Sequence, residues 1–423
     1  MKVSRRTLVL AVIAAVLVTI VVLNWGAGDE RLERPIRPAY AVSDPQFVRS
    51  LSALLGPPLL PGHTATELLN GDQIFPAMLG AIRAARRTIS FETYIYWEGV
   101  IGRQFTEALV DRARAGVRVH VLVDWMGAKV DEQMLAEMRG AGIEFEFYRP
   151  LRWYNLDRMN HRTHRKFLIV DGRVGFTGGV GVADHWLGNA QDAEHWRESH
   201  FQVEGPAVAQ MQAAFMDNWT RTRGVVLHGS DYFPELEPKG DALAQVVKSS
   251  PEDGSEATRI LYMMSIAAAR RSIYLANSYF LPDDVAVEAL VAARKRGVDV
   301  QVIAPGPIID TKITRRASRA RWGPLLEAGI EIYEYMPTMY HCKVLVVDDL
   351  WVSVGSTNFD ERSFKLNGEG NLNVLSEPFA RRQVEVFFQD RARSRRVTLE
   401  EWQSRPWKEK LLEHAANLIG SQL

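Results

Sequence analysis

Residues 340–358 read YHCKVLVVDDLWVSVGSTN, and this stretch decides the fold. Its spacing is HxKxxxxD, followed after six residues by a glycine and a small residue. The stretch HRKFLIVDGRVGFTGG at residues 164–179 repeats that spacing. The earlier copy carries His164, Lys166 and Asp171, and the later copy carries His341, Lys343 and Asp348. Two copies with identical spacing predict a chain built from two related halves.

The residues after each lysine explain the spacing. The runs FLIV and VLVV are apolar and rich in β-branched residues, which indicates buried strands. Side chains alternate faces along a strand, so each histidine lies on the same face as its lysine. An imidazole can attack phosphorus when neutral or donate a proton when charged, and a neighbouring ammonium suits a phosphate-bearing substrate. Two such pairs facing each other need no metal and no cofactor.

The rest of the chain repeats around the motifs. Residues 84–89 match 268–273, residues 109–124 match 290–305, and GAGIEFEFY ending at Tyr148 matches EAGIEIYEY ending at Tyr335. Helical and strand patterns alternate in each half, which predicts an α/β fold with a largely parallel sheet and helices on both faces. The composition of residues 233–240 indicates a linker. We expect two duplicated α/β/α sandwich halves, a pseudo-two-fold arrangement and an active site between them.

The motifs resemble the HKD motifs of the phospholipase D superfamily. Within it, the chain is similar to the bacterial cardiolipin synthases from about Leu68 to the C-terminus. The segments that carry the likeness are NHRTHRKFLIVDGRVGFTGG, WRESHFQVEGPAVAQMQ, AGIEIYEY and GSTNFDERSFKLNGEGN.

The resemblance implies a two-step phosphatidyl transfer. His164 would attack the phosphorus of phosphatidylglycerol to form a phosphatidyl-histidine, and His341 would protonate the departing glycerol. His341 would then deprotonate a second phosphatidylglycerol, giving cardiolipin. The residues expected to hold the phosphate oxygens are Lys166, Lys343 and Asn358, assisted by Ser356.

Each histidine also needs a carboxylate to fix its tautomer. Glu369, in Asn-Gly-Glu after the second motif, fits the family pattern, and Glu198 occupies the matching segment of the first half. Asp171 and Asp348 belong to the motifs but stand at the far ends of the strands, so we expect structural roles. The first half departs from the family pattern at Gly181, where an asparagine is usual, and therefore lacks one phosphate donor.

Other functions share these motifs. A phospholipase D would pass the same intermediate to water and release phosphatidic acid. An HKD nuclease is disfavoured because the formal net charge of the 423 residues is zero and supplies no field for nucleic acid. A non-catalytic scaffold would not need two complete His-Lys pairs.

The N-terminus predicts a membrane anchor. Lys2, Arg5 and Arg6 precede an uncharged apolar run from Thr7 to Trp25 that is long enough to cross a bilayer. A cleavable signal is the alternative, and we favour retention because the apolar run is long for a signal. Basic residues on both flanks leave the orientation open. The expected divisions are an anchor at 1–27, a tether at 28–67, and phospholipase D-like domains at 68–235 and 236–423, on a bacterial inner membrane.

Several features carry weaker predictions. Cys342, the single cysteine, should be a buried spectator that points away from the site. His161 and His164 lack the further ligands of a metal site. The histidines at 185, 195 and 200 line the substrate mouth or form a polar surface loop. The arginines of residues 314–322 form a solvated helix face or bind an anionic head group. The tail from Trp402 to Leu423 packs on the second domain or lies in a membrane interface.

Overall fold

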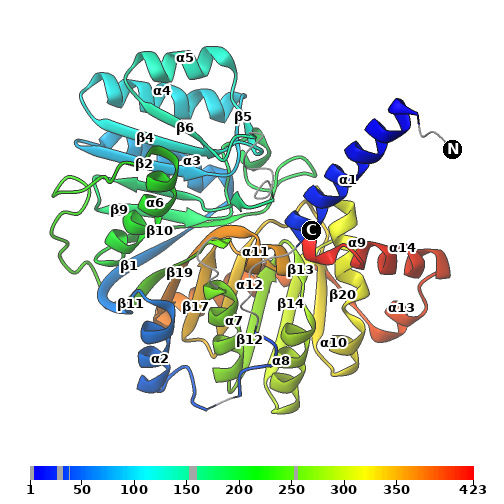
Figure 1. Cartoon of the computed structure of the whole chain (residues 1–423). Coiled ribbons are helices and arrows are strands. Elements are labelled where there is room, and N and C mark those ends of the chain that lie inside the picture. Colours follow the sequence, from blue (N-terminus) through cyan, green and yellow to red (C-terminus); the bar gives the residue numbers. More distant parts are fainter. Residues whose placement is uncertain (1–3, 26–31, 38, 152–159, 252–255) are drawn as a thin grey trace.

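A computed structural model describes residues 4–25, 32–37, 39–151, 160–251 and 256–423, without the side chains of residues 17 and 20–25. The described residues form one continuous 16-stranded sheet (Figure 1). The first half contributes, in spatial order, β1 (Leu60–Leu69), β10 (Ser199–Glu204), β9 (Val174–Gly178), β8 (Phe167–Val170), β2 (Thr88–Thr93), β4 (Arg118–Asp124) and β6 (Glu144–Tyr148). The second half repeats this order as β11 (Ala242–Ser249), β19 (Asn367–Leu375), β17 (Trp351–Gly355), β16 (Lys343–Val347), β12 (Ser272–Asn277), β14 (Asp299–Pro305) and β15 (Glu331–Tyr335), with β20 (Ser394–Val397) at the edge.

The two halves join where β1 pairs antiparallel with β11. The matching strand orders on either side of this joint give the pseudo-two-fold arrangement expected from the repeats. The expectation of a largely parallel sheet is wrong, because among the strands named above only β2, β4 and β6, and their counterparts β12, β14 and β15, run parallel to a neighbour in this order. Each motif strand instead turns back at once, β8 into β9 and β16 into β17. The tight turns begin at Asp171 and Asp348, which both have positive φ angles.

Helices cover both faces of the sheet. On one face α6 (Ala207–Arg223) and α12 (Glu377–Ala392) share a single apolar core that contains strand residues from both halves. On the other face each half has its own core. The first uses α3 (Asn70–Ala84), α4 (Val100–Arg114) and α5 (Glu132–Gly140), and the second uses α7 (Ala257–Ala268), α8 (Asp284–Lys295) and α10 (Gly323–Glu327). The shared core and the β1–β11 pairing hold the halves together.

Part of the expected tether is folded. Helix α2 (Pro45–Leu55) buries Phe47, Leu51 and Leu55, which recur every four residues along one helical face. These side chains belong to the core of the second half, where Phe47 lies edge-on to Trp351 with ring centroids 5.0 Å apart. Strand β1 then begins at Leu60, so the first half starts earlier than the expected Leu68.

The N-terminal helix α1 (Arg5–Trp25) projects away from the rest of the chain in Figure 1. In the described part of the chain, no helix combines the length and the apolar character needed to cross a membrane. The predicted anchor and the beginning of the tether lie partly outside the described residues, at 1–3 and 26–31.

The arginine-rich segment forms α9 (Lys312–Ala320), and the expectation of a solvated face or a head-group site is wrong for most of it. Arg315 pairs with Glu334, Arg319 pairs with both Glu334 and Glu413, and Arg321 pairs with Asp284. The pairs of Arg315 and Arg319 join α9 to strand β15 and to the C-terminal helix α14 (Trp407–Asn417), and the pair of Arg321, just after α9, reaches α8. The tail therefore packs on the second half, with α13 (Leu399–Gln403) beside it.

Candidate active site

The two motifs meet at a cavity of about 260 Å³ between the halves. His164 and Lys166 line it from the first half, and His341 and Asn358 line it from the second. The further lining residues are Tyr94, Ile95, Arg162, Trp186, Trp196, Tyr279, Asp310, Thr311, Asp360, Arg362, Asn367 and Leu423. The expected pairing of the two motifs across one site is therefore present in the geometry.

Each histidine is positioned by the backbone of the opposite half. Strand β7 (Arg162–Thr163), just before His164, pairs with Asn367 and Gly368 of β19. The His164 amide donates to the Gly368 carbonyl oxygen at 2.8 Å. The His341 amide donates to the Arg197 carbonyl oxygen, also at 2.8 Å. Neither histidine loop can hold this position without the other half.

Each histidine also contacts a carboxylate from the opposite half. Nδ1 of His164 lies 3.0 Å from both oxygens of Glu369, which belongs to the second half. Nδ1 of His341 lies 2.6 Å from Oε2 of Glu198, which belongs to the first half. Both carboxylates are fully buried. Because each Nδ1 faces a carboxylate, Nε2 is the nitrogen that each imidazole has left for a ligand, and Nε2 of His341 lies 3.2 Å from Nζ of Lys343.

The two lysines make matching contacts. Nζ of Lys166 donates to the His164 carbonyl oxygen, and Nζ of Lys343 donates to the His341 carbonyl oxygen, both at 2.7 Å. Each ammonium is thus held beside its own histidine, as strand alternation predicts. Burial lowers the pKa of Lys166 to about 7 and also lowers that of Lys343. The nearby charge of Lys343 is a further cause of the low pKa of Lys166, and a bound phosphate anion would raise the pKa of both lysines.

A short hydrogen-bonded chain orients Asn358. Lys343 donates to the Ser278 hydroxyl at 2.7 Å, and Ser278 donates to Oδ1 of Asn358 at 2.7 Å. The asparagine amide therefore keeps its NH₂ group as a donor for a ligand. Ser356 does not take the role expected of it, because its hydroxyl is buried and donates to Glu369. It positions a carboxylate and does not line the cavity.

The first half has no counterpart of the Asn358 amide or of the Ser356 hydroxyl. A Cβ at Gly181, the counterpart of Asn358, would lie 2.8 Å from Ile95 Cβ and 3.2 Å from the Trp186 ring. Ile95 and Trp186 thus fill the space of the missing donor. Gly179, the counterpart of Ser356, packs against the Glu198 carboxyl group, which therefore has no hydroxyl partner there.

This asymmetry separates the two carboxyl groups chemically. Burial raises the pKa of Glu198 to about 7. Burial would also raise the pKa of Glu369, but His164, Lys166 and the Ser356 hydroxyl together hold it below its ordinary value. Burial lowers the pKa of His164 to about 4, and burial with the nearby Lys343 lowers that of His341 well below 6.5. At neutral pH His164 is an uncharged imidazole beside an ionised carboxylate, whereas the Glu198–His341 pair retains a proton.

The motif aspartates lie away from the cavity. Asp171 accepts hydrogen bonds from the amides of residues 86, 87 and 88 at 2.7–3.2 Å. Asp348 accepts from the amides of residues 270, 271 and 272 at 2.7–3.1 Å. Each carboxylate therefore fixes the backbone that leads into β2 or β12.

Most of the residues that line the cavity leave no recognisable pattern in the sequence. Trp186 and Trp196 pack against His341, with ring centroids 5.4 and 5.5 Å away, and form an aromatic wall. Arg162 stands two residues before His164, so strand alternation could have indicated it. Nothing in the sequence signals Tyr94, whose ring lies 5.5 Å from that of His164.

The weaker predictions have mixed outcomes. His185 stacks on Trp196 at 5.2 Å, whereas His195 pairs with Asp192 at the surface and His200 is buried in β10. Cys342 is buried as expected and lies 3.8 Å from the Arg197 carbonyl oxygen. The described residues contain no group of three or more His, Cys, Asp or Glu side chains that could hold a metal ion.

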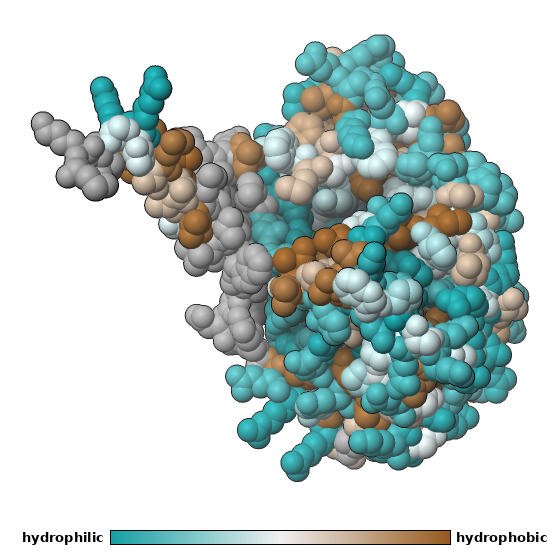
Figure 2. Space-filling model, turned by 90° about the vertical axis from the view of Figure 1, so that its right-hand side faces the viewer, coloured by the Kyte–Doolittle hydropathy of each residue, from teal (hydrophilic) through white to brown (hydrophobic). Residues whose placement is uncertain are grey.

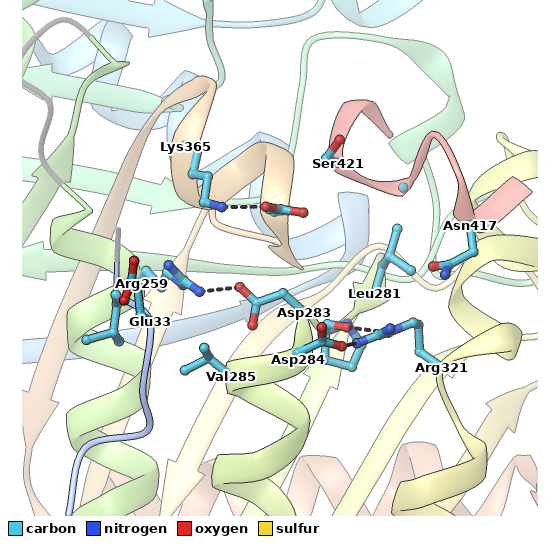
Figure 3. A pocket seen from close by; sticks show the side chains of 14 residues that line it. Glu33, Arg259, Leu281, Asp283, Asp284, Val285, Arg321, Lys365, Asn417 and Ser421 are labelled. Atoms are coloured by element: carbon cyan, nitrogen blue, oxygen red, sulfur yellow. Dashed lines mark hydrogen bonds and ion pairs between the residues drawn. The ribbon is translucent and has the colours of Figure 1, made fainter. Parts of the chain in front are cut away.

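A larger cavity of about 460 Å³ lies nearby but contains neither histidine (Figure 3). The cations in its lining pair with neighbouring carboxylates, Arg259 with Asp283, Arg321 with Asp284 and Lys365 with Glu361. These charges are already balanced within the protein. We therefore place the active site in the smaller cavity.

Comparisons with known proteins agree with this geometry. A family described as "Cardiolipin synthase, PLD-like domain" matches residues 78–219 and 262–391, one block in each half. The cardiolipin synthase of Geobacillus kaustophilus is 35% identical over 371 residues, which are 87% of this chain and 74% of that protein. Cardiolipin synthase 1 of Bacillus anthracis is 36% identical over 374 residues, 85% of this chain and 73% of that protein.

Solved structures support the fold. The crystal structure of phosphatidylserine synthase from Haemophilus influenzae superposes with a TM-score of 0.66, covering 89% of this chain and all of that chain at 12% identity. Polyphosphate kinase from Porphyromonas gingivalis gives a TM-score of 0.52 at 12% identity, covering 92% of this chain and 57% of that chain. At these identities the likeness concerns the fold alone.

Proposed function

This chain belongs to the cardiolipin synthases of the phospholipase D-like family, and we propose that it joins two phosphatidylglycerols through a phosphatidyl-histidine. One lipid donates its phosphatidyl group, the other accepts it, and glycerol is released. The observation that carries this proposal is the convergence of both motif histidines on one cavity, each held by a buried carboxylate and each beside its own lysine. No metal or cofactor takes part in the proposed steps.

His164 is the nucleophile in this proposal. Its pKa of about 4 keeps the ring uncharged at neutral pH, and Glu369 occupies Nδ1. Nε2 then carries the lone pair that forms the bond to phosphorus. The ionised Glu369 stabilises the positive charge that develops on the ring during attack.

His341 is the acid for the first step and the base for the second. The Glu198–His341 pair holds one proton near neutral pH, since the pKa of Glu198 is about 7. This proton passes through His341 to the departing glycerol oxygen. The pair then accepts the proton of the incoming hydroxyl, which attacks phosphorus and releases His164.

Lys166, Lys343 and Asn358 hold the phosphate oxygens. Lys166 and Asn358 line the cavity from opposite halves, and Lys343 lies behind Asn358, to which it is linked through Ser278. Negative charge on the phosphate oxygens grows as attack proceeds. Each donor is worth about 3 kcal/mol of transition-state stabilisation, judged from comparable sites.

Phospholipase D activity is the competing function, and the aromatic wall favours transfer. Trp186 and Trp196 stand beside His341, where the alcohol leaves and the acceptor arrives. Their rings offer apolar contact to the carbons of glycerol and displace water from that side. Trp196→Ala should therefore raise the ratio of phosphatidic acid to cardiolipin about tenfold, with Trp196→Phe as the conservative control. An unchanged product ratio would contradict this role for the wall.

The proposed enzyme works at a bacterial inner membrane. The structure describes the side chains of the run from Thr7 to Trp25 only in part, but its sequence is uncharged throughout and largely apolar, and as a continuous helix it would be about 28 Å long, close to the thickness of the hydrocarbon core. We propose that it is retained as a single-pass anchor. Mass spectrometry of the N-terminus of the membrane-extracted protein tests this, because a cleaved signal would remove that run.

Lipid mass spectrometry of the purified full-length chain, supplied with phosphatidylglycerol in mixed micelles, tests the function. Cardiolipin and glycerol in equal amounts, absent with His164→Ala and with His341→Ala, are the expected result. Phosphatidic acid as the only product would make the enzyme a phospholipase. Cleavage of single-stranded DNA without lipid turnover would make it a nuclease.

A further inference from the structure

The C-terminal helix α14 exposes an unusual amount of apolar surface. Trp407, Leu411 and Leu418 have exposed fractions of 69%, 61% and 80%. They are spaced four and seven residues apart, which places them on one face of the helix. We call these three residues the α14 stripe. Leu412, beside it, is 49% exposed.

The opposite face of α14 is firmly fixed. Glu413 is buried and pairs with Arg319 at 2.9 Å and with Arg405 at 2.8 Å. Ala416 is also buried, in a small apolar cluster with Ala317 of α9 and Leu281. With this face held by buried ion pairs, the α14 stripe must point outward. Rotating the helix to hide the stripe would break these buried ion pairs and expose their charged groups.

Helix α14 leads directly into the active site. The chain that follows it ends at Leu423, which lines the catalytic cavity. Helix α9, packed against α14, is preceded by Thr311, which lines the same cavity, and Ile313 on α9 is 38% exposed. Figure 2 looks onto the side that carries α14 at the right of Figure 1 and shows a hydrophobic patch within hydrophilic surroundings.

Basic residues flank this patch. Lys312 and Arg316 on α9 and Lys408 on α14 are exposed. Tryptophan and leucine on one face with lysine and arginine at the border match a helix that lies in the head-group region of an anionic bilayer. A protein partner would not need this combination next to the entrance for a lipid.

We propose that the α14 stripe inserts into the head-group region of the bilayer and holds the cavity mouth against the membrane that supplies the substrate. This inference rests on the proposed function, because a lipid whose acyl chains stay in the bilayer can bring only its head group to His164. The mouth must therefore lie at the bilayer surface. The α14 stripe is the apolar surface that borders it on the side of the second half.

Site-specific labelling tests the proposal in the full-length chain. Cys342 is the single native cysteine, it is buried, and burial raises its pKa to about 12, so an introduced cysteine can be labelled selectively. Leu411→Cys and Leu418→Cys would carry an environment-sensitive fluorophore. Val226→Cys, 59% exposed after α6, and Leu54→Cys, 65% exposed on α2, are matched controls far from α14 in Figure 1.

The labelled proteins are reconstituted in phosphatidylglycerol vesicles that contain lipids with a nitroxide near the head group. Labels at 411 and 418 should be quenched about twofold or more relative to the controls. Quenching equal to that of the controls would overturn the proposal. Disulfide formation between copies of Leu411→Cys, with quenching no greater than in the controls, would do the same and identify a second copy as the occupant.

Activity assays on vesicles and on detergent micelles distinguish this docking proposal from the proposed activity. The double variant Trp407→Glu, Leu411→Glu should lose about tenfold or more of its activity on vesicles and keep wild-type activity in detergent micelles, where docking is not needed. Equal activity in vesicles would overturn the docking role. Failure of the wild-type chain to act on lipid in either medium would instead overturn the proposed function, while the quenching result would still stand.

Discussion

At the residue scale, the crossed pairing of histidines and carboxylates gives the two imidazoles different chemistry. Glu369 receives a hydroxyl hydrogen bond from Ser356 and stays ionised, whereas Glu198 faces Gly179 and has a raised pKa. Glu369 has Ser356 beside it in addition to His164 and Lys166, whereas a glycine takes the place of that serine beside Glu198. This difference supports the proposal that His164 is the nucleophile and His341 the acid.

Exchanging one carboxylate at a time tests the crossed pairs. Glu369→Gln should alter the tautomer of His164 and leave the His341 ring unchanged, and Glu198→Gln should do the reverse. Each variant should lower kcat by about 10²- to 10⁴-fold, since a catalytic histidine needs its carboxylate. Nitrogen NMR of the imidazoles reports which ring responds. A response of His164 to Glu198→Gln would contradict the crossing.

The pH profile should be bell-shaped. Below about pH 4 His164 becomes protonated and cannot attack, which sets the acid limb. Above about pH 7 the Glu198–His341 pair loses its proton and Lys166 loses its charge, so activity falls as pH rises. The dependence of kcat/KM on pH reports these free-enzyme values. A rate that stays level up to pH 9 would show that Glu198 does not hold the transferred proton.

At the scale of secondary-structure elements, an aspartate at the end of each motif strand fixes the position of that strand. Asp171 and Asp348 occupy turn positions with φ of 52° and 55° and reach across to three consecutive amides before β2 or β12. Each aspartate thereby fixes the register between a motif strand and its neighbour. The length of the motif strand explains why the two motifs have identical spacing. The histidine must lie just before the strand, at the cavity, while the aspartate lies just after it and binds the neighbouring backbone.

Asp348→Asn should destabilise the fold by about 2–3 kcal/mol, because one carboxylate oxygen is replaced by an NH₂ group that faces amide donors. Asparagine tolerates the positive φ, so backbone strain does not add to the effect. Urea unfolding measures the loss, and kcat of the folded fraction should be unchanged. Asp349→Asn is the matched control, since Asp349 also has a positive φ but is 39% exposed and makes only a 3.8 Å contact with Arg271. Equal destabilisation by both variants would contradict the argument.

At the scale of the whole molecule, one chain builds one active site from two halves. The sheet is continuous through β1 and β11, and α6 and α12 share a core across the joint. Helix α2, although it precedes the first half, packs on the second. The halves therefore cannot separate without exposing apolar surface on both.

Because both halves of the site lie in one chain, inactive variants should not rescue each other. A mixture of His164→Ala and His341→Ala proteins, refolded separately and then combined, should show no cardiolipin synthesis above either variant alone. Lipid mass spectrometry measures the product. Recovery of a substantial fraction of wild-type activity would show that sites form between chains.

The duplication, the α/β class, the two His-Lys pairs and the structural place of the aspartates could all be predicted from the sequence. These features depend on the spacing of residues along one strand or on repeated segments, and both can be seen directly in the amino-acid sequence. The antiparallel strands at the centre of the sheet could also have been predicted, since Asp-Gly and Asp-Asp turns follow the motif strands directly. The alternation of helices and strands instead suggested a parallel sheet.

Only the tertiary structure decided which carboxylate serves which histidine, because that depends on how strands some 200 residues apart lie beside each other. The same reason applies to the aromatic wall, to the burial of α2 and to the ion pairs of α9. Each arises where surfaces from distant segments meet, and the free energy of burying them together is a property of the pair. The sequence of either segment alone does not indicate this free energy.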